Sequence, residues 1–269
     1  MKARTKNTNA AWRAGLVLSS VLLFVMLVGV IYTPYDPDAM NGAEKFSAPC
    51  LEHWMGTDNF GRDIFSRVLE GLRTTFLVAF SVTAIGSLFG VLLGAVTGYF
   101  GGLADEILMR INDALTAFPS ILLALVFISV TGSGKYNIIS ALGIIFIPSF
   151  ARIVRGEYIR QKELDYVKSA KLAGAGAFRI MFVHILPNIL PAFLSAVTVG
   201  FNNAVLAEAG MSYLGIGVQP PDASLGRMLS EAQGYLFSAP WYALGPGVTI
   251  VLLILGFSLI NEGIGEQHA

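Results

Sequence analysis

The chain has 269 residues, of which 54% are hydrophobic and only 13% charged, and its formal net charge is zero. Soluble domains carry about 25% charged residues, so the composition excludes an ordinary soluble domain. The balanced charge gives no sign of a nucleic-acid partner. The single cysteine, Cys50, excludes an intramolecular disulfide and a cysteine-based metal cluster.

The first apolar segment, residues 14–32, follows an N-terminal stretch that has four basic residues and no acid. This segment is longer than the apolar region of a signal peptide, which spans about 7–15 residues. It also ends at Thr33 and Pro34, without a run of small residues for cleavage. We therefore expect a retained transmembrane helix.

Five further apolar stretches follow along the chain. Crossing a hydrocarbon layer about 30 Å thick takes about 20 apolar residues in a helix. The stretches lie within residues 74–104 and at about 114–133, 136–153, 185–207 and 241–260. None shows the period-two alternation of a membrane β-barrel. The sequence predicts an all-α integral membrane protein with six transmembrane helices.

The distribution of Lys and Arg predicts the orientation in the membrane. The basic N-terminus is expected in the cytoplasm, and six spans return the C-terminus to that side. The segment 151–184, with seven basic and three acidic residues, then also lies in the cytoplasm. We expect three parts: an N-terminal tail, first helix and external segment (1–72), a core (73–263) and a short cytoplasmic tail (264–269).

Glycines recur every four residues in the second span, at Gly86, Gly90, Gly94 and Gly98. Such residues stay near one face of a helix and let another helix backbone approach closely. The pattern predicts helix packing at these positions. Packing within this chain and packing against a second subunit are both compatible with it.

The interiors of the second, third, fifth and sixth spans contain no ionisable residue. Ionisable residues inside the membrane mark proton relays and ion pathways, so a self-sufficient secondary carrier is disfavoured. An intramembrane enzyme is also disfavoured, because His53, His184 and His268 lie outside the spans. The sequence thus predicts no catalytic residue and no metal site in this chain.

Residues 131–136 resemble part of a nucleotide-binding phosphate loop. A working loop needs G-x-x-x-x-G-K-[ST], whereas here Ser129 replaces the first glycine and Tyr136 the final hydroxyl residue. We expect no ATP site in this chain, and therefore an energy source outside it.

The cytoplasmic segment at about 156–187 carries the most informative pattern. Residues 157–172 predict a helix that ends at Gly174, because glycine there can adopt the left-handed conformation that stops a helix. A second short helix is expected to run to the Leu186–Pro187 step. Small residues give this helical pair a surface suited to docking in a partner's groove. The predicted docking residues are Tyr166, Val167, Lys168, Ser169, Ala170, Lys171, Leu172, Ala173, Gly174, Ala175, Leu186 and Pro187.

This segment resembles the EAA loop of ATP-binding-cassette importer permeases. Ala170, Gly174 and the Ile185–Pro187 ending match the loop's second alanine, its glycine and its I-x-L-P. Lys168 and Ser169 stand where glutamate and alanine are usual. That departure puts a glutamate-specific contact in question, but not the docking mode.

Further segments narrow the resemblance to the dipeptide, oligopeptide and nickel permeases, and to their second (C-type) subunit. Residues 56–67 read GTDNFGRDIFSR, 117–124 read AFPSILLA and 207–221 read AEAGMSYLGIGVQPP. Residues 228–232 and 238–241 add MLSEA and SAPW. The similarity runs from residue 34 to residue 263.

The resemblance implies a type I importer permease of the bacterial cytoplasmic membrane. Its partners would be a second permease, two cytoplasmic ATPases that bind ATP and Mg²⁺, and an external substrate-binding protein. The implied cargo is small peptides, with nickel or a metal–chelator complex as the alternative. From topology, candidate contacts with the binding protein or an outer gate are Asp58, Gly61, Arg62, Asp63, Gln219, Pro220 and Pro221.

Overall fold

The computed structural model describes the backbone of residues 2–266 and the side chains of residues 11–264. Regular structure within these residues is helical, apart from one isolated bridge between Thr57 and Asp63. The long elements are α1 (Lys2–Ile31), α2 (Ile64–Phe100), α3 (Gly102–Thr116), α4 (Ser120–Thr131), α5 (Lys135–Gln161), α8 (Leu186–Tyr213) and α10 (Pro240–Glu266). The short ones are η1 (Gly42–Glu44), α6 (Asp165–Leu172), α7 (Ala177–Arg179), the π-helical η2 (Ile180–Ile185), α9 (Leu225–Ala232) and η3 (Gln233–Tyr235).

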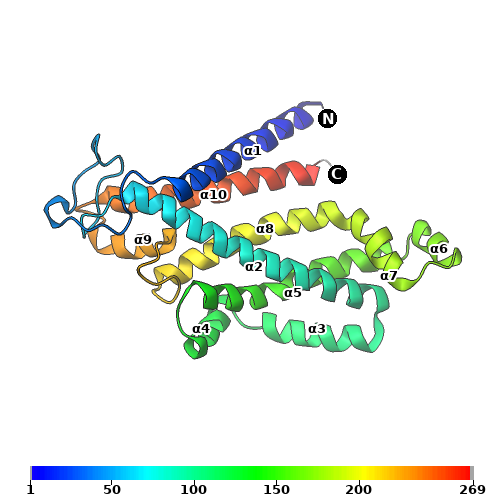
Figure 1. Ribbon diagram of the computed structural model, residues 1–269. Helices are drawn as coiled ribbons and strands as arrows, with labels where there is room; N and C mark the ends of the chain where they lie inside the picture. The colour runs from blue at the N-terminus through cyan, green and yellow to red at the C-terminus, as the bar shows by residue number, and fades with distance from the viewer. Residues whose placement is uncertain (1, 267–269) are drawn as a thin grey trace.

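The long helices form an elongated bundle (Figure 1). Helices α1 and α10 pair along one edge, α2, α5 and α8 form the centre, and α3 and α4 lie along the other edge. The segment between α1 and α2 covers one end together with α9, and α6 projects from the opposite end. The two chain ends lie close together on the side of α6. The predicted tail at 264–269 falls mostly outside the described residues.

Among the residues that the structure describes, five helical stretches are long and apolar enough to cross a membrane, and the bent pair α3–α4 makes up to six. The predicted third span at 114–133 is not one straight helix, because α3 and α4 meet at 88°. Pro119 causes the break, since the residue before a proline is disfavoured in helical conformation. The second span is also longer than predicted. It begins at Ile64, where the Asp63 carboxylate accepts a hydrogen bond from the Ser66 N–H at 2.7 Å.

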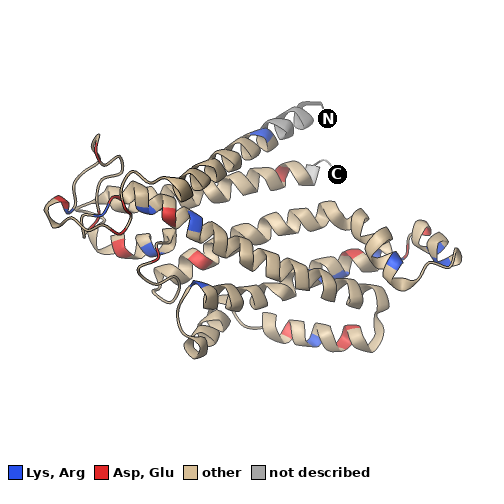
Figure 2. Ribbon diagram, viewed as in Figure 1, with Lys and Arg blue, Asp and Glu red and all other residues tan. Residues whose placement is uncertain are grey.

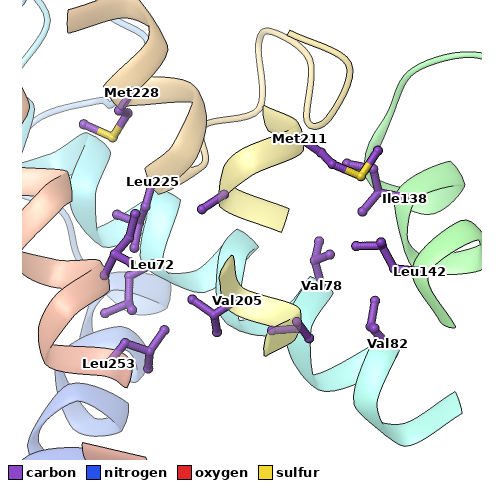
Figure 3. Packing of buried hydrophobic residues seen from close by; sticks show 14 of the residues in the cluster. Leu72, Val78, Val82, Ile138, Leu142, Val205, Met211, Leu225, Met228 and Leu253 are labelled. Carbon is purple, nitrogen blue, oxygen red and sulfur yellow. The ribbon is translucent and has the colours of Figure 1, made fainter. Parts of the chain in front are cut away.

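Two hydrophobic clusters hold the bundle together. The larger joins α2, α5, α8, α9 and α10 through buried aliphatic side chains such as Leu72, Val78, Leu142, Val205 and Leu253. Figure 3 shows these residues pointing toward one another from different helices. The second cluster lies toward α6. Helix α2 contributes buried residues to both clusters, so it connects the two parts of the core.

The glycine row of α2 lies against α5 of the same chain. A Cβ atom added at Gly86 would lie 2.9 Å from the Phe146 Cβ, and one added at Gly94 would lie 2.6 Å from the Ala151 carbonyl oxygen. Gly90 and Gly98 meet α5 in the same way. The glycine pattern is compatible with packing within the chain or against a second subunit. The contacts with α5 show packing within the chain.

Charged residues gather at the two ends of the bundle and on α3, and the central parts of the other long helices are largely uncharged (Figure 2). One exception corrects the prediction for the fifth span. Helix α8 continues to Tyr213, so Glu208 lies inside it and is fully buried. Its Oε1 accepts a hydrogen bond from the Ser212 hydroxyl at 2.7 Å. The predicted absence of ionisable residues therefore holds only as far as Ala207.

Candidate coupling loop and transport cleft

The segment at 156–187 is built differently from the predicted continuous helix at 157–172. Helix α5 runs on to Gln161, the chain turns at 162–164, and only Asp165–Leu172 form the separate helix α6. Leu164, the N-cap of α6, has extended dihedral angles (φ −78°, ψ 152°), which separate α6 from α5. The break lets α6 turn back so that Val167 is fully buried in the second cluster. Burial of Val167 therefore explains why residues 157–172 form two helices and not the single helix that the sequence predicts.

Gly174 stops α6 as the sequence predicts. Its φ is +82°, in the left-handed region that favours glycine. The Gly174 N–H donates to the Lys171 carbonyl and the Ala175 N–H to the Ala170 carbonyl, both at 3.0 Å. This pair of bonds is the Schellman motif, which satisfies the last carbonyls of a helix. The turn after α6 is therefore a defined structure.

Side-chain contacts fasten the loop to the bundle. The Tyr158 hydroxyl on α5 donates to the Met181 carbonyl at 2.9 Å, and the Tyr166 hydroxyl on α6 donates to Gln161 Oε1 at 2.8 Å. Lys162 Nζ reaches the carbonyl of Gly98 at the end of α2, at 3.0 Å. The loop that contains α6 is thus fastened to α5 and to the end of α2, and it leads directly into α8.

The face of the loop that points away from the bundle is uncovered and partly apolar. Leu172 is 91% exposed and Phe178 75% exposed. Lys168, Ser169 and Ala173 are also exposed. Exposed apolar side chains rimmed by polar residues mark protein–protein contact sites. Leu186 is half-buried and Pro187 exposed at the start of α8, so they lie at the joint between loop and bundle.

A cleft of about 650 Å³ lies between α4, α5 and α8. Its lining is mostly apolar, with four uncharged polar residues: Ser120 on α4, Ser149 on α5, and Ser195 and Asn203 on α8. Ser195 and Asn203 are eight residues apart, close to two helical turns, so they share a face of α8. The cleft offers hydrogen bonds without fixed charge, which suits a polar solute that crosses without being held tightly.

The end of the bundle opposite α6, which the sequence predicts to be the outer end, holds a buried ion-pair network. Arg62 Nε donates to Asp58 Oδ2 at 2.6 Å, and its Nη2 donates to Glu231 Oε2 at 3.1 Å. The Tyr242 hydroxyl also donates to Glu231, at 3.1 Å, and Arg227 Nε to Glu231 Oε1 at 3.1 Å. The network joins the external segment to α9 and α10.

Burial and charge act in opposite directions on Arg62. Burial lowers the pKa of its guanidinium, whereas the neighbouring Asp58 and Glu231 carboxylates raise it, and the net shift is upward. Arg62 therefore keeps its charge throughout the accessible pH range. The same end of the bundle holds a second polar contact, between His53 Nδ1 and Asp63 Oδ1, which are 2.8 Å apart.

The candidate outer contacts fall into two groups. Asp58, Gly61, Arg62 and Asp63 are buried and engaged with one another or with neighbouring helices. Gly61 takes φ +75° with no room for a side chain, because the Asn41 carbonyl packs against it. These four residues shape the outer surface from within and present little of it. Within the loop at 219–221, by contrast, Pro220 and Pro221 are exposed and Gln219 is half-buried.

The family described as binding-protein-dependent transport system inner membrane component matches residues 90–265. The chain belongs to this family. It is the membrane component of a binding-protein-dependent transport system, and the resemblance drawn from its motifs is confirmed.

Named relatives cover almost the whole permease. It is 37% identical to the dipeptide transport system permease protein DppC of Alkalihalophilus pseudofirmus over 94% of this chain and 83% of the relative. It is 35% identical to the glutathione transport system permease protein GsiD of Pectobacterium atrosepticum, over 98% and 92%. It is also 35% identical to the probable D,D-dipeptide permease DdpC of Escherichia coli, over 93% and 85%.

A solved structure agrees with the fold. The permease matches an inward-facing structure of the MetNI methionine ABC transporter with a TM-score of 0.58 and 20% sequence identity. The match covers 76% of this chain and 95% of the other. At this identity the likeness concerns the fold alone, and it confirms the predicted all-α permease architecture.

Sequence reasoning missed two groups of residues. The polar residues of the cleft stand alone in apolar helices, and the eight-residue spacing of Ser195 and Asn203 was the available signal. Glu231 was noticed only as part of a motif. Its partner Arg62 is 169 residues away in sequence, and no spacing rule connects positions so far apart.

Proposed function

We propose that this permease forms one half of the path for small peptides in an ATP-driven importer. A second permease supplies the other half, two cytoplasmic ATPases bind ATP and Mg²⁺ and hydrolyse the nucleotide, and an external binding protein delivers the cargo. In this proposal the chain is not an enzyme and holds no cofactor. Both termini and α6 face the cytoplasm.

One observation carries the coupling role. The exposed apolar tip of the loop consists of Leu172 at the end of α6 and Phe178 on α7, in a loop fastened to α2 and α5 and continuous with α8. Two of these helices, α5 and α8, line the cleft. A partner that grips this tip can therefore move the cleft walls as rigid bodies, which an unstructured loop would not transmit.

The cleft lining favours peptides over the alternative cargo, nickel or a metal–chelator complex. Serine hydroxyls and an asparagine amide can donate to and accept from peptide groups. Nickel binds preferentially to nitrogen and sulfur ligands such as imidazole and thiolate. The relatives named for dipeptide transport point in the same direction.

At the outer end, the proposal places the binding protein over α9 and the external segment, with Gln219, Pro220 and Pro221 in contact. The network around Arg62 holds this surface in one shape. A rigid surface loses little conformational entropy when a partner docks.

Affinity purification of the permease from its native membrane tests the proposal. We expect a second permease, ATPase subunits and a binding protein to be recovered and identified by mass spectrometry. A Leu172→Asp variant should insert and pair with the second permease but lose the ATPases. The matched Leu51→Asp variant, which places the same charge at a residue 96% exposed on the outer segment, should retain them.

Two results would contradict the proposal. Stoichiometric recovery of ATPases with Leu172→Asp would show that α6 is not the docking helix. A partner-free chain that transports peptides in vesicles without ATP would show a self-sufficient carrier.

A further inference from the structure

A second cavity, of about 250 Å³, lies at the outer ends of α2 and α5. Its wall includes two acidic and two basic side chains: Glu70 and Arg73 from α2, Lys135 from α5, and Asp222 from the loop that precedes α9. Thr74 and Tyr136 add hydroxyl groups. Both signs of charge therefore face one small space, in contrast to the uncharged cleft deeper in the bundle.

Only half of these charges are paired. Lys135 Nζ lies 2.7 Å from Asp222 Oδ2. Among the described residues, neither Glu70 nor Arg73 takes part in an ion pair, although they are three residues apart on one helix. Glu70 Oε2 is shielded from solvent and accepts no hydrogen bond. A shielded acceptor without a donor is costly, so this wall of the cavity is complete only when a donor is bound.

The cavity lies on the same side of α5 as the cleft. Lys135 and Ser149, which line the cavity and the cleft, are 14 residues apart. At about 100° per residue their directions differ by about 40°, and they are about 21 Å apart along the helix axis. A solute that leaves the outer cavity toward the cytoplasm would follow this face into the cleft.

We propose that this charged pocket binds the two ends of a small zwitterionic peptide before it enters the cleft. Glu70 accepts hydrogen bonds from the peptide ammonium group, and the Arg73 guanidinium binds the peptide carboxylate. The Lys135–Asp222 pair closes the side of the pocket toward the outer loop. This inference rests on the proposed function and names its cargo class more closely.

Three features select this ligand. An ammonium group supplies the missing donor to Glu70, and a planar guanidinium matches carboxylate geometry. The volume lies just below the usual range of about 300–1,000 Å³ for ligand pockets, so a small peptide fits better than a long one. A bare divalent cation would meet the positive charges of Arg73 and Lys135, which repel it.

Ligand-observed NMR on the membrane complex in nanodiscs, without the binding protein, tests the pocket. The probes are Ala-Ala, N-acetyl-Ala-Ala and Ala-Ala amide. We expect Glu70→Gln to weaken binding of Ala-Ala about tenfold, because a charge-assisted hydrogen bond is lost, and to leave the N-acetylated peptide unchanged. Arg73→Gln should weaken Ala-Ala similarly and leave the amide unchanged. This pairing of protein and ligand changes isolates each contact.

Control variants remove a charge elsewhere. Glu262 and Arg13 lie toward the ends of α10 and α1 that are remote from the pocket. The Glu262→Gln and Arg13→Gln variants should bind all three peptides as the wild type does. Equal losses for blocked and free peptides in Glu70→Gln would overturn the proposal, as would the absence of Ala-Ala binding to the wild type.

A second arm separates this proposal from the function on which it rests. The complete wild-type complex, with binding protein and ATP, is assayed for Ala-Ala uptake. Uptake without binding in the first arm would overturn the pocket and leave the importer function standing. Failure of uptake in the assembled complex would instead contradict the proposed function.

Discussion

The two ends of this permease, which we propose face the outside and the cytoplasm, are built on different principles. At the end opposite α6, the ion pair between Asp58 and Arg62 is buried and satisfied within the chain: Asp58 is fully buried and Arg62 is 7% exposed. At the inner end, the coupling loop leaves apolar side chains uncovered, with Leu172 91% exposed. The network around Arg62 is thus satisfied within the chain, whereas the tip at Leu172 presents an apolar surface that a partner can cover.

The difference matches the two tasks proposed for the molecule. A surface that receives successive binding proteins has to keep one shape, and a buried ion network fixes shape through directional bonds. A coupling element has to be gripped and moved, and an exposed apolar tip on a fastened helix allows that. The glycine row of α2 lies between the two ends and holds α2 against α5.

The largest effect is expected when the outer network is broken. Arg62→Ala removes the hydrogen-bonded ion-pair partner of the fully buried Asp58 carboxylate and one of three hydrogen-bond partners of Glu231, and we expect a destabilisation of about 3–5 kcal/mol. Thermal unfolding of the purified permease in detergent should show a strongly lowered midpoint.

The inner end supplies the control for this prediction. Lys168 and Asp165 on α6 are exposed and 3.7 Å apart, and surface pairs of this kind contribute about 0–1 kcal/mol. Lys168→Ala should therefore leave the midpoint nearly unchanged. Equal shifts in the two variants would remove the contrast between the ends.

Next in size is a change in the glycine row. Gly94→Ala places a Cβ atom 2.6 Å from the Ala151 carbonyl oxygen, so α2 and α5 have to separate. Overpacking of this kind costs about 1–3 kcal/mol. Gly156→Ala on α5 is the matched control, because nothing lies within 4 Å of the added atom. A Gly94→Ala variant as stable as Gly156→Ala would show that the helices adapt freely.

The sequence predicted the parts of this fold that depend on local pattern. Apolar length located the membrane helices, and Gly174 was recognised as a helix stop because its role is local. The break at Pro119 was missed, although the proline was visible, because apolar length outweighed it in locating the third span. The bond between Arg62 and Glu231 was not predictable, since it arises only when the folded helices bring distant segments together.

The turn after α6 should respond less strongly than the glycine row. Gly174→Ala forces alanine into the left-handed region at φ +82°, at a cost of about 1–2 kcal/mol. Gly176→Ala is the control in the same loop, because its φ is −69° and nothing lies within 4 Å. Hydrogen exchange at residues 165–185 should accelerate in Gly174→Ala only. Equal exchange in both variants would show that the turn does not limit the loop's stability.

The smallest expected effect concerns pH at the inner end. Burial raises the pKa of the Tyr166 hydroxyl, although a hydrogen bond with Asn188 opposes the shift. The protonated form is therefore favoured in the folded loop. Its contribution to stability is fully present below about pH 10, the ordinary pKa of tyrosine, and is lost as the pH rises through the higher folded-state value.

Comparison of the wild type with Tyr166→Phe isolates this contribution. At neutral pH the variant loses the hydrogen bond to Gln161, which is worth about 0.5–1.5 kcal/mol. Above pH 10 the wild type also has to ionise Tyr166, so the difference between the two proteins should narrow. Unfolding midpoints of the two proteins are measured from pH 8 to pH 11. A difference between the midpoints that stays constant over this range would mean that the Tyr166 hydroxyl is as accessible to solvent as the neighbouring Leu172.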